Sequence, residues 1–153
     1  METEKPKAWI GIDPGKDGAA ALLSEDAIDY FDWPGDSVQA AKEIGRWLED
    51  YHISLAVIEK VSARPGNGSV SMFKFGTNYG VWHGILSAFS IPFTLLSPSQ
   101  WQKGLVTPTD GNEPKQRSLT VARRLFPKAE LHLKKHHGRS DALLMAYTAR
   151  RKG

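Results

Sequence analysis

The sequence predicts an α/β fold built around a mixed β-sheet, and three observations lead to this class. Strand signals in residues 8–33 are broken by turns at residues 14–18 and 34–35, which is the pattern of an antiparallel meander. Apolar side chains in residues 36–51 have helical spacing, and a strand at residues 54–59 follows at once, as in a β-α-β crossover. A meander followed by a crossover combines antiparallel and parallel pairs in one sheet.

The rest of the chain continues the alternation of helices and strands. Helical spacing of apolar residues covers residues 69–90, and residues 92–96 form a short strand. Glycine recurs every fourth residue on one face of that helix, at Gly76, Gly80 and Gly84. Because an interior glycine costs about 1 kcal/mol relative to alanine, we expect another backbone against this face, within the domain or across a dimer interface. The elements expected after this point are a capped helical turn at 97–103, a mobile loop at 106–114, and helices at 115–126 and 139–151.

Length and composition predict one intracellular domain. The 153 residues fit a single domain over residues 1–153, in which residues 1–7 are expected to form a flexible N-terminal tail. Cysteine is absent, which excludes disulfides and thiolate zinc sites. No signal peptide and no run of roughly 18 apolar residues are seen, so we expect no membrane association. We expect a cytoplasmic or nucleoid location in a bacterium or phage host, with an organelle as the alternative.

The charge is distributed unevenly along the chain. Residues 1–114 carry 9 Lys and Arg against 15 Asp and Glu, whereas residues 115–153 carry 11 against 2. A basic block beside an acidic body favours a polyanionic partner, with nucleic acid as the first candidate. The alternative is a solvated basic helix face.

Three carboxylates stand where core elements end or begin. Asp13 ends the first strand, Glu59 ends the strand at residues 54–59, and Asp141 lies at the start of the last helix. Each has an ordinary structural explanation when it is taken alone, as a turn former, a strand-end charge or an acid in a first helical turn. Together they could provide the oxygen ligands that a hard divalent cation prefers.

The motifs around these acids resemble those of RuvC-type Holliday junction resolvases, within the RNase H-like superfamily. The relevant segments are IGIDPG at 10–15, VIE at 57–59 and HHGRSDALL at 136–144. Other segments resemble the compact branch that includes chloroplast MOC-one-like resolvases and phage or bacterial relatives; these are GVWHG at 80–84, SQWQK at 99–103 and ARRLFP at 122–127. The resemblance covers about residues 8–150. It implies an RNase H-like mixed five-stranded sheet flanked by α-helices, a homodimer, and metal-dependent paired symmetric nicking of four-way DNA junctions.

The resemblance also assigns a metal site. It implies that Asp13, Glu59 and Asp141 bind two Mg²⁺ or Mn²⁺ ions, one activating a water and the other stabilising the departing 3′ oxygen. Many RuvC-type enzymes have a further Asp or His three residues before the last acid, where this chain has Gly138. His137 could take that role if its helix begins early enough, and His136 is the rival.

Candidate DNA contacts come from the same resemblance and from charge. Lys103 and Lys115 are expected near the scissile phosphate, where ammonium groups would favour the transition state. Arg64, Phe73 and Lys74 follow the strand of Glu59, where such resolvases contact the junction centre. Phe73 could stack on an unpaired base there, or it could belong to the core. A phosphate-tracking surface is predicted for Arg117, Arg123, Arg124, Lys134, Lys135 and Arg139.

Three other functions compete with junction cleavage. A second RNase H-like nuclease, acting on structured DNA or on ribosomal RNA precursors, would share the carboxylates. An ATPase or sugar kinase fits poorly, because such proteins enclose the nucleotide between two domains of this kind. A non-catalytic junction-binding module would bind DNA without cutting it, and the intact acid triad argues against it.

Overall fold

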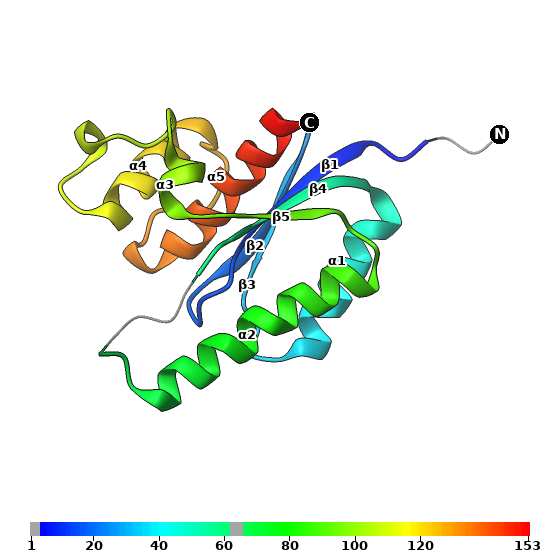
Figure 1. Ribbon diagram of the computed structural model, residues 1–153. Helices are drawn as coiled ribbons and strands as arrows, with labels where there is room; N and C mark the ends of the chain where they lie inside the picture. The colour runs from blue at the N-terminus through cyan, green and yellow to red at the C-terminus, as the bar shows by residue number, and fades with distance from the viewer. Residues whose placement is uncertain (1–3, 62–65) are drawn as a thin grey trace.

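The computed structural model describes residues 4–61 and 66–153 (Figure 1). Its centre is a five-stranded sheet in the order β3-β2-β1-β4-β5. The strands are β1 (Lys7–Asp13), β2 (Ala19–Ser24), β3 (Ile28–Asp32), β4 (His52–Glu59) and β5 (Phe93–Leu96). The helices are α1 (Ser37–Asp50), α2 (Ser69–Ala88), α3 (Pro98–Gln102), α4 (Pro114–Leu125) and α5 (His137–Lys152), with 3-10 turns η1 (Pro108–Asp110) and η2 (Lys134–His136).

The first three strands form the predicted meander. β1 pairs antiparallel with β2, and β2 pairs antiparallel with β3. The ordered chain begins earlier than predicted, because Lys7 already belongs to β1 and the carbonyl of Pro6 accepts a hydrogen bond from the amide of His52 at 2.9 Å. Residues 6 and 7 of the expected tail therefore belong to the sheet region, and residues 1–3 lie outside the described residues.

The crossover through α1 makes the sheet mixed, as predicted. Asp36 caps α1 by accepting a hydrogen bond from the amide of Val38 at 3.1 Å. β4 then pairs parallel with β1, and β5 pairs parallel with β4. Parallel neighbours end at the same edge of the sheet, so the carboxyl ends of β1, β4 and β5 lie side by side.

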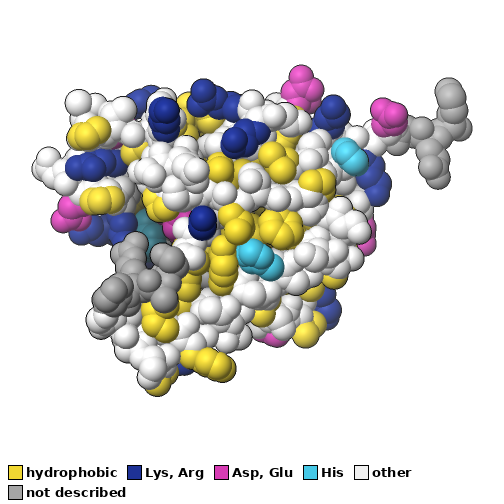
Figure 2. Space-filling model, in the orientation of Figure 1, with side chains coloured by type: hydrophobic (Ala, Val, Ile, Leu, Met, Phe, Trp, Pro, Cys, Tyr) yellow, Lys and Arg dark blue, Asp and Glu magenta, His cyan; other side chains and the backbone are white. Residues whose placement is uncertain are grey.

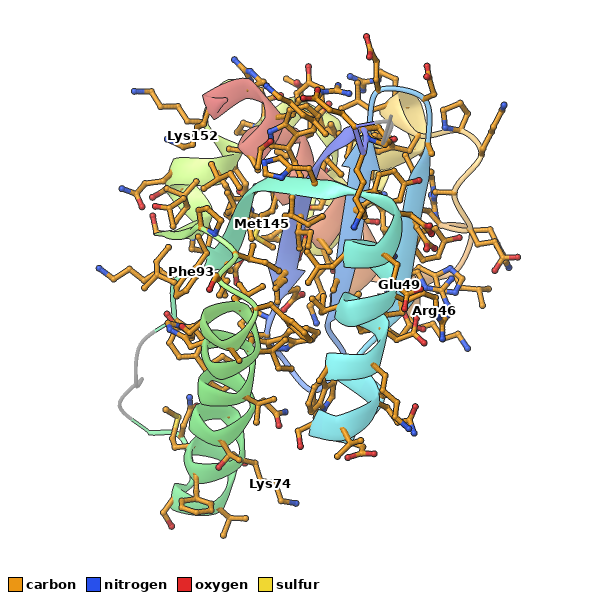
Figure 3. All side chains as sticks on the ribbon, turned by 90° about the vertical axis from the view of Figure 1, so that its right-hand side faces the viewer. Arg46, Glu49, Lys74, Phe93, Met145 and Lys152 are labelled. Carbon is orange, nitrogen blue, oxygen red and sulfur yellow. The ribbon has the colours of Figure 1, made fainter. Side chains whose placement is uncertain are left out.

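Helices cover both faces of the sheet and enclose two cores. α1 and α2 pack on one face around residues such as Ile10, Ile44 and Trp82. Figure 3 shows these two helices in front of the sheet. α3, α4 and α5 pack on the other face, where Trp101 and Leu144 are buried. No helix in the described parts of the chain is both long enough and apolar enough to span a membrane.

The glycine face of α2 is open within the chain. A Cβ atom added at Gly76, Gly80 or Gly84 would meet nothing within 4 Å among the described residues. Of the two explanations offered for this pattern, close approach by another part of the same domain finds no support among the described residues. The dimer interface stays a prediction.

Candidate metal centre and nucleic-acid interface

Three potential metal ligands converge where β1 ends and α5 begins. Asp13 is the last residue of β1, and His137 and Asp141 lie one turn apart on α5. Each offers one ligand atom, and these atoms all lie within 4.8 Å of one another. α5 begins at His137, two residues earlier than predicted, so the condition that brings His137 onto the same helix face as Asp141 is met.

Close backbone packing explains why residue 138 contributes no ligand. Gly138 lies against the β1–β2 turn, and a Cβ atom there would sit 2.3 Å from the carbonyl oxygen of Asp17. The family's Asp or His therefore does not fit at this position in this chain. His137, one residue earlier, faces Asp13 instead.

The two aspartates of this cluster are buried and influence each other. Burial raises the pKa of Asp13, although the amide of Gly15, which donates to its Oδ1 at 3.1 Å, and the charge of His137 oppose the shift. Burial, followed by the charges of Asp13 and Glu59, holds the pKa of Asp141 well above its ordinary value. A divalent cation between these groups would remove both penalties.

Glu59 stands at the adjacent strand end. β4 runs parallel to β1 with Ile58 opposite Ile12, which sets Glu59 beside Asp13 at the same edge. Its Oε2 accepts a hydrogen bond from the indole Nε1 of Trp101 at 2.9 Å. Glu59 lies outside the group of ligand atoms that are within 4.8 Å, but its charge acts on Asp141.

Sequence reasoning missed two residues that contact the acids. The buried hydroxyl of Ser118, on α4, donates a hydrogen bond to Asp141, and the buried indole of Trp101, on α3, donates to Glu59. Both partners come from elements far along the chain. No local pattern in the sequence could have found them.

A cleft opens from the acids towards α2. It has a volume of about 680 Å³ and is lined by residues that include Asp13, His137, Phe73 and Lys74. Phe73 is 78% exposed, so the interpretation of this residue as core is wrong. An adjoining cleft of about 660 Å³ shares Asp13 and contains Glu59.

A basic hollow lies on the opposite side of His137. It is lined by Lys115, Arg123, Lys134 and Lys135, together with His137 itself. The charge of Lys115 lowers the pKa of both Asp13 and Asp141, and its role near a scissile phosphate stays a prediction. Figure 2 shows Lys and Arg gathered over the upper, α3–α5 side of the molecule, and hydrophobic side chains exposed along the lower, α2 side.

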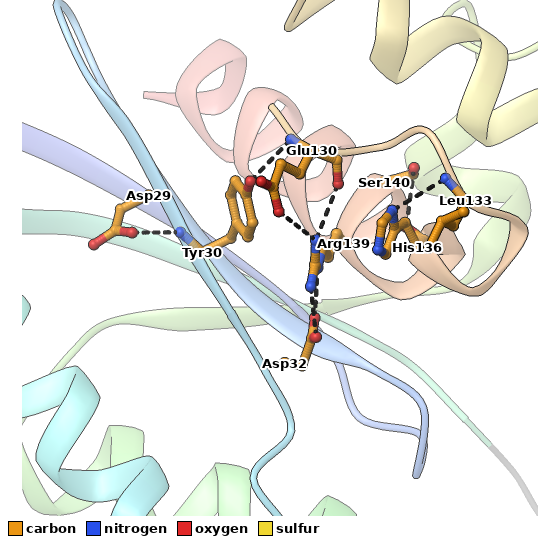
Figure 4. Close-up of polar contacts among 8 residues, drawn as sticks. All are labelled: Asp29, Tyr30, Asp32, Glu130, Leu133, His136, Arg139 and Ser140. Atoms are coloured by element: carbon orange, nitrogen blue, oxygen red, sulfur yellow. Dashed lines mark hydrogen bonds and ion pairs between the residues drawn. The ribbon is translucent and has the colours of Figure 1, made fainter. Parts of the chain in front are cut away.

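Other predicted contacts are engaged elsewhere or stand apart. Arg139 donates hydrogen bonds from two nitrogens to the Asp32 carboxylate, each at 2.8 Å, and also contacts Glu130 (Figure 4). These ion pairs occupy its guanidinium group, so Arg139 is a poor candidate for the predicted phosphate-tracking surface. Arg117 donates to the carbonyl of Gly111 at 2.7 Å and braces the loop before α4.

Three further predicted residues need a separate account. Arg124 pairs with Asp110 at 3.3 Å but stays exposed. Lys103 is exposed at the end of α3, and no contact links it to the acids. Arg64 lies outside the described residues.

His136 lies outside the group formed by Asp13, His137 and Asp141. It is buried, and its Nδ1 accepts a hydrogen bond from the amide of Leu133 at 3.2 Å, as Figure 4 shows. Burial lowers its pKa, and the neighbouring charge of Arg139 lowers it further. The imidazole of His136 is therefore neutral and hydrogen-bonded within its own turn, and His137 is the histidine of the cluster.

Comparisons with known proteins agree with this geometry. No family model matches the chain. Over 131 residues, 84% of the chain, it is 34% identical to the chloroplastic Holliday junction resolvase MOC1 of Chlamydomonas reinhardtii, and it spans 13% of that protein's length.

Solved structures confirm the fold. RuvC of T. thermophilus in complex with a Holliday junction substrate is similar with a TM-score of 0.64 at 16% identity, covering 96% of both chains. The yeast mitochondrial Holliday junction resolvase Ydc2 is similar with a TM-score of 0.56 at 12% identity, covering 99% of this chain and 80% of that one. The predicted RNase H-like fold and the resemblance to RuvC-type resolvases are thereby confirmed.

Proposed function

We propose that this protein is a RuvC-type Holliday junction resolvase, a metal-dependent endonuclease that makes paired symmetric nicks in four-way DNA junctions. The observation that carries this proposal is the convergence of Asp13, His137 and Asp141 on the fold of RuvC. The identity to a chloroplastic resolvase over 84% of the chain supports the same activity.

The donor set fits a hard divalent ion, and we propose Mg²⁺ or Mn²⁺, two per site. Carboxylate oxygens and one imidazole nitrogen suit these cations, and a bound cation would favour the charged forms of the two partly buried aspartates, whose pKa values burial raises. Asp13, Glu59, Asp141 and His137 would hold the ions. Bound there, the ions supply activation of a water nucleophile and stabilisation of the leaving oxygen.

The flanks of the site suit a branched polyanion. Lys115 lies near the aspartates, and Arg123, Lys134 and Lys135 extend the positive charge away from them, which fits a phosphate backbone entering from that side. On the other side, Phe73 presents a free aromatic face beside Lys74, which fits an unpaired base at a crossover. Lys103 and Arg64 stay weaker candidates for DNA contact.

We propose a homodimer that uses the open glycine face of α2. Three glycines on one face of α2 leave a surface without side chains, on which a second helix could pack closely. The other described residues of this chain do not cover that surface. Two copies would present two metal centres to the two strands of a symmetric junction. Analytical ultracentrifugation of wild type and Gly80→Leu tests this: wild type should sediment as a dimer and the variant as a folded monomer.

The deciding experiment compares substrates with and without Mg²⁺. A labelled mobile four-way junction should be nicked at symmetric positions only when Mg²⁺ is present, whereas linear duplex DNA and a structured RNA should stay intact. Asp13→Asn should bind the junction but not cut it. Preferential cleavage of the RNA would favour a processing RNase, and junction binding with no cleavage by wild type would favour a non-catalytic module.

A further inference from the structure

We propose that Trp101 is a positioning residue for Glu59, and that its indole N–H fixes this carboxylate at the metal centre. The inference rests on the proposed function, in which Glu59 helps to hold the divalent ions. Trp101 belongs to the core of the α3–α5 face and is only 1% exposed, yet its Nε1 donates to Glu59 Oε2 at 2.9 Å. The indole N–H therefore provides a polar contact between this core and the carboxylate.

The position of Trp101 follows from how α3 is attached to the sheet. β5 runs parallel to β4 with Leu96 opposite Glu59, and the amide of Lys60 donates to the carbonyl of Leu96 at 2.7 Å. Ser97 then caps α3 through a capping box with Gln100. A short helix thus begins two residues after Leu96, the partner of Glu59, and it carries the indole to the end of β4.

Trp101 is also tied to the helix that carries the other ligands. The hydroxyl of Thr148, on α5, lies within hydrogen-bond reach of the carbonyl of Trp101 at 3.4 Å, and the two elements pack in one core. The indole is thereby held relative to both β4 and α5.

Such a donor meets a specific need at this site. Glu59 and the two aspartates repel one another, which favours turning a carboxylate away from the cluster. Asp13 is held by the amide of Gly15 and Asp141 by the hydroxyl of Ser118, so each acid has its own neutral donor. Removing an outer partner of a metal ligand typically weakens metal binding about 10- to 100-fold.

The test is Mn²⁺ binding by calorimetry without DNA, in wild type and in Trp101→Phe. Phenylalanine keeps an aromatic ring in the core but removes the donor, so we expect affinity to fall about 10- to 100-fold. Trp82→Phe is the matched control, since Trp82 is fully buried on the opposite face and its Nε1 has no hydrogen-bond partner among the described residues. The control should bind Mn²⁺ like wild type, and both variants should lose similar thermal stability.

A double-mutant cycle with Glu59→Gln separates positioning from general damage. If Trp101 acts through Glu59, Trp101→Phe should lower Mn²⁺ affinity much less in the Glu59→Gln background. Equal losses in both backgrounds, or unchanged affinity of Trp101→Phe, would overturn the proposal. Should Trp101→Phe fail to fold, the indole N–H resonance of wild type decides: it should shift when Mg²⁺ is added, and a resonance that does not move contradicts the role.

The outcomes also separate this inference from the proposed function. If wild type binds Mn²⁺ and Trp101→Phe does not, but no junction is cut, the positioning role stands and the resolvase proposal fails. If wild type cuts junctions and Trp101→Phe binds Mn²⁺ normally, the resolvase proposal stands and the positioning role fails. Wild type that binds no Mn²⁺ overturns both.

Discussion

The two long helices on opposite faces of the sheet differ in how much of them the protein encloses. Eight of the 16 residues of α5 are buried, against three of the 20 residues of α2. α5 lies between the sheet and α4 and carries two of the potential ligands. α2 projects past the sheet with its first half exposed, as the position of Lys74 in Figure 3 shows. The enclosed helix α5 thus positions potential metal ligands, whereas α2 leaves most of its surface accessible to solvent.

The difference begins with small residues. β1 and α5 approach so closely that Gly11 faces backbone atoms of Ala142 and Ala146, which leaves no room for a side chain. The glycines of α2 face open space instead. Glycine therefore marks an internal contact where β1 meets α5 and a surface on α2 that the other described residues leave open.

The largest loss of stability should come from a substitution in the contact between β1 and α5. In Gly11→Val, the new Cβ would lie 2.0 Å from the carbonyl oxygen of Ala142, and neither backbone can move cheaply. We expect a loss of about 4 kcal/mol or more in the free energy of unfolding, measured by urea denaturation. Gly80→Ala is the control and should stabilise the monomer by up to about 1 kcal/mol, since alanine favours the helix. Similar losses in both variants would contradict the contrast between the two helices.

Asp141→Asn should separate activity from stability. We expect cleavage to fall at least about 1000-fold, which corresponds to about 4 kcal/mol of barrier. Without metal, the variant should melt at a higher temperature than wild type at neutral pH. The folded pKa of Asp141 is raised, so wild type loses stability as pH rises from the unfolded value of 3.8 through the folded one, and asparagine avoids that loss.

The pH dependence checks the sign of this effect. The stability gain of Asp141→Asn, measured in a chelator, should disappear below the unfolded pKa, where both proteins are uncharged at this position. A variant that melts below wild type at neutral pH, or that keeps its cleavage activity, would contradict the role assigned to Asp141.

Much of this arrangement could be predicted from local patterns. Periodicity predicted the meander, the crossover and the helices, and strand ends predicted the acids, because parallel strands bring their ends together. The sequence offered His137 as a further ligand on the condition that the last helix begins early enough, and α5, which begins at His137, meets that condition.

Long-range partners could not be predicted in this way. Trp101 lies 42 residues from Glu59, and Asp32 lies 107 residues from Arg139, so no spacing rule links them. The prediction from charge grouped Arg139 with its basic neighbours, although Asp32 and Glu130 already neutralise its positive charge. Basic residues alone therefore overestimate the surface that is available to DNA.

A substitution on the exposed surface of α2 should change the affinity for a four-way junction but not the free energy of unfolding. Phe73→Ala removes an exposed ring beside the metal centre, so we expect four-way junction affinity to fall about 10-fold, within the range for one base stacked on an aromatic side chain. The free energy of unfolding should change by less than about 0.5 kcal/mol. Phe89→Ala, at the other end of α2 and 40% exposed, is the control for lost apolar surface. Equal effects of both variants on junction binding, measured by fluorescence anisotropy, would contradict the placement of the junction at Phe73.

The smallest effect should come from the ion pair that links α5 to the meander. The hydrogen bonds from Arg139 lower the pKa of Asp32, so this pair stabilises the fold above the unfolded pKa and its contribution is lost as pH falls through the lower folded value. Because the Asp32 side chain is 56% exposed, Asp32→Asn should cost less than about 1 kcal/mol at neutral pH and nothing in strong acid, as measured by thermal melts. Mn²⁺ affinity should stay unchanged, because packing against β1 and α4, and not a surface charge, holds α5 in place. A marked loss of Mn²⁺ binding would mean that the position of α5 depends on the ion pair between Arg139 and Asp32.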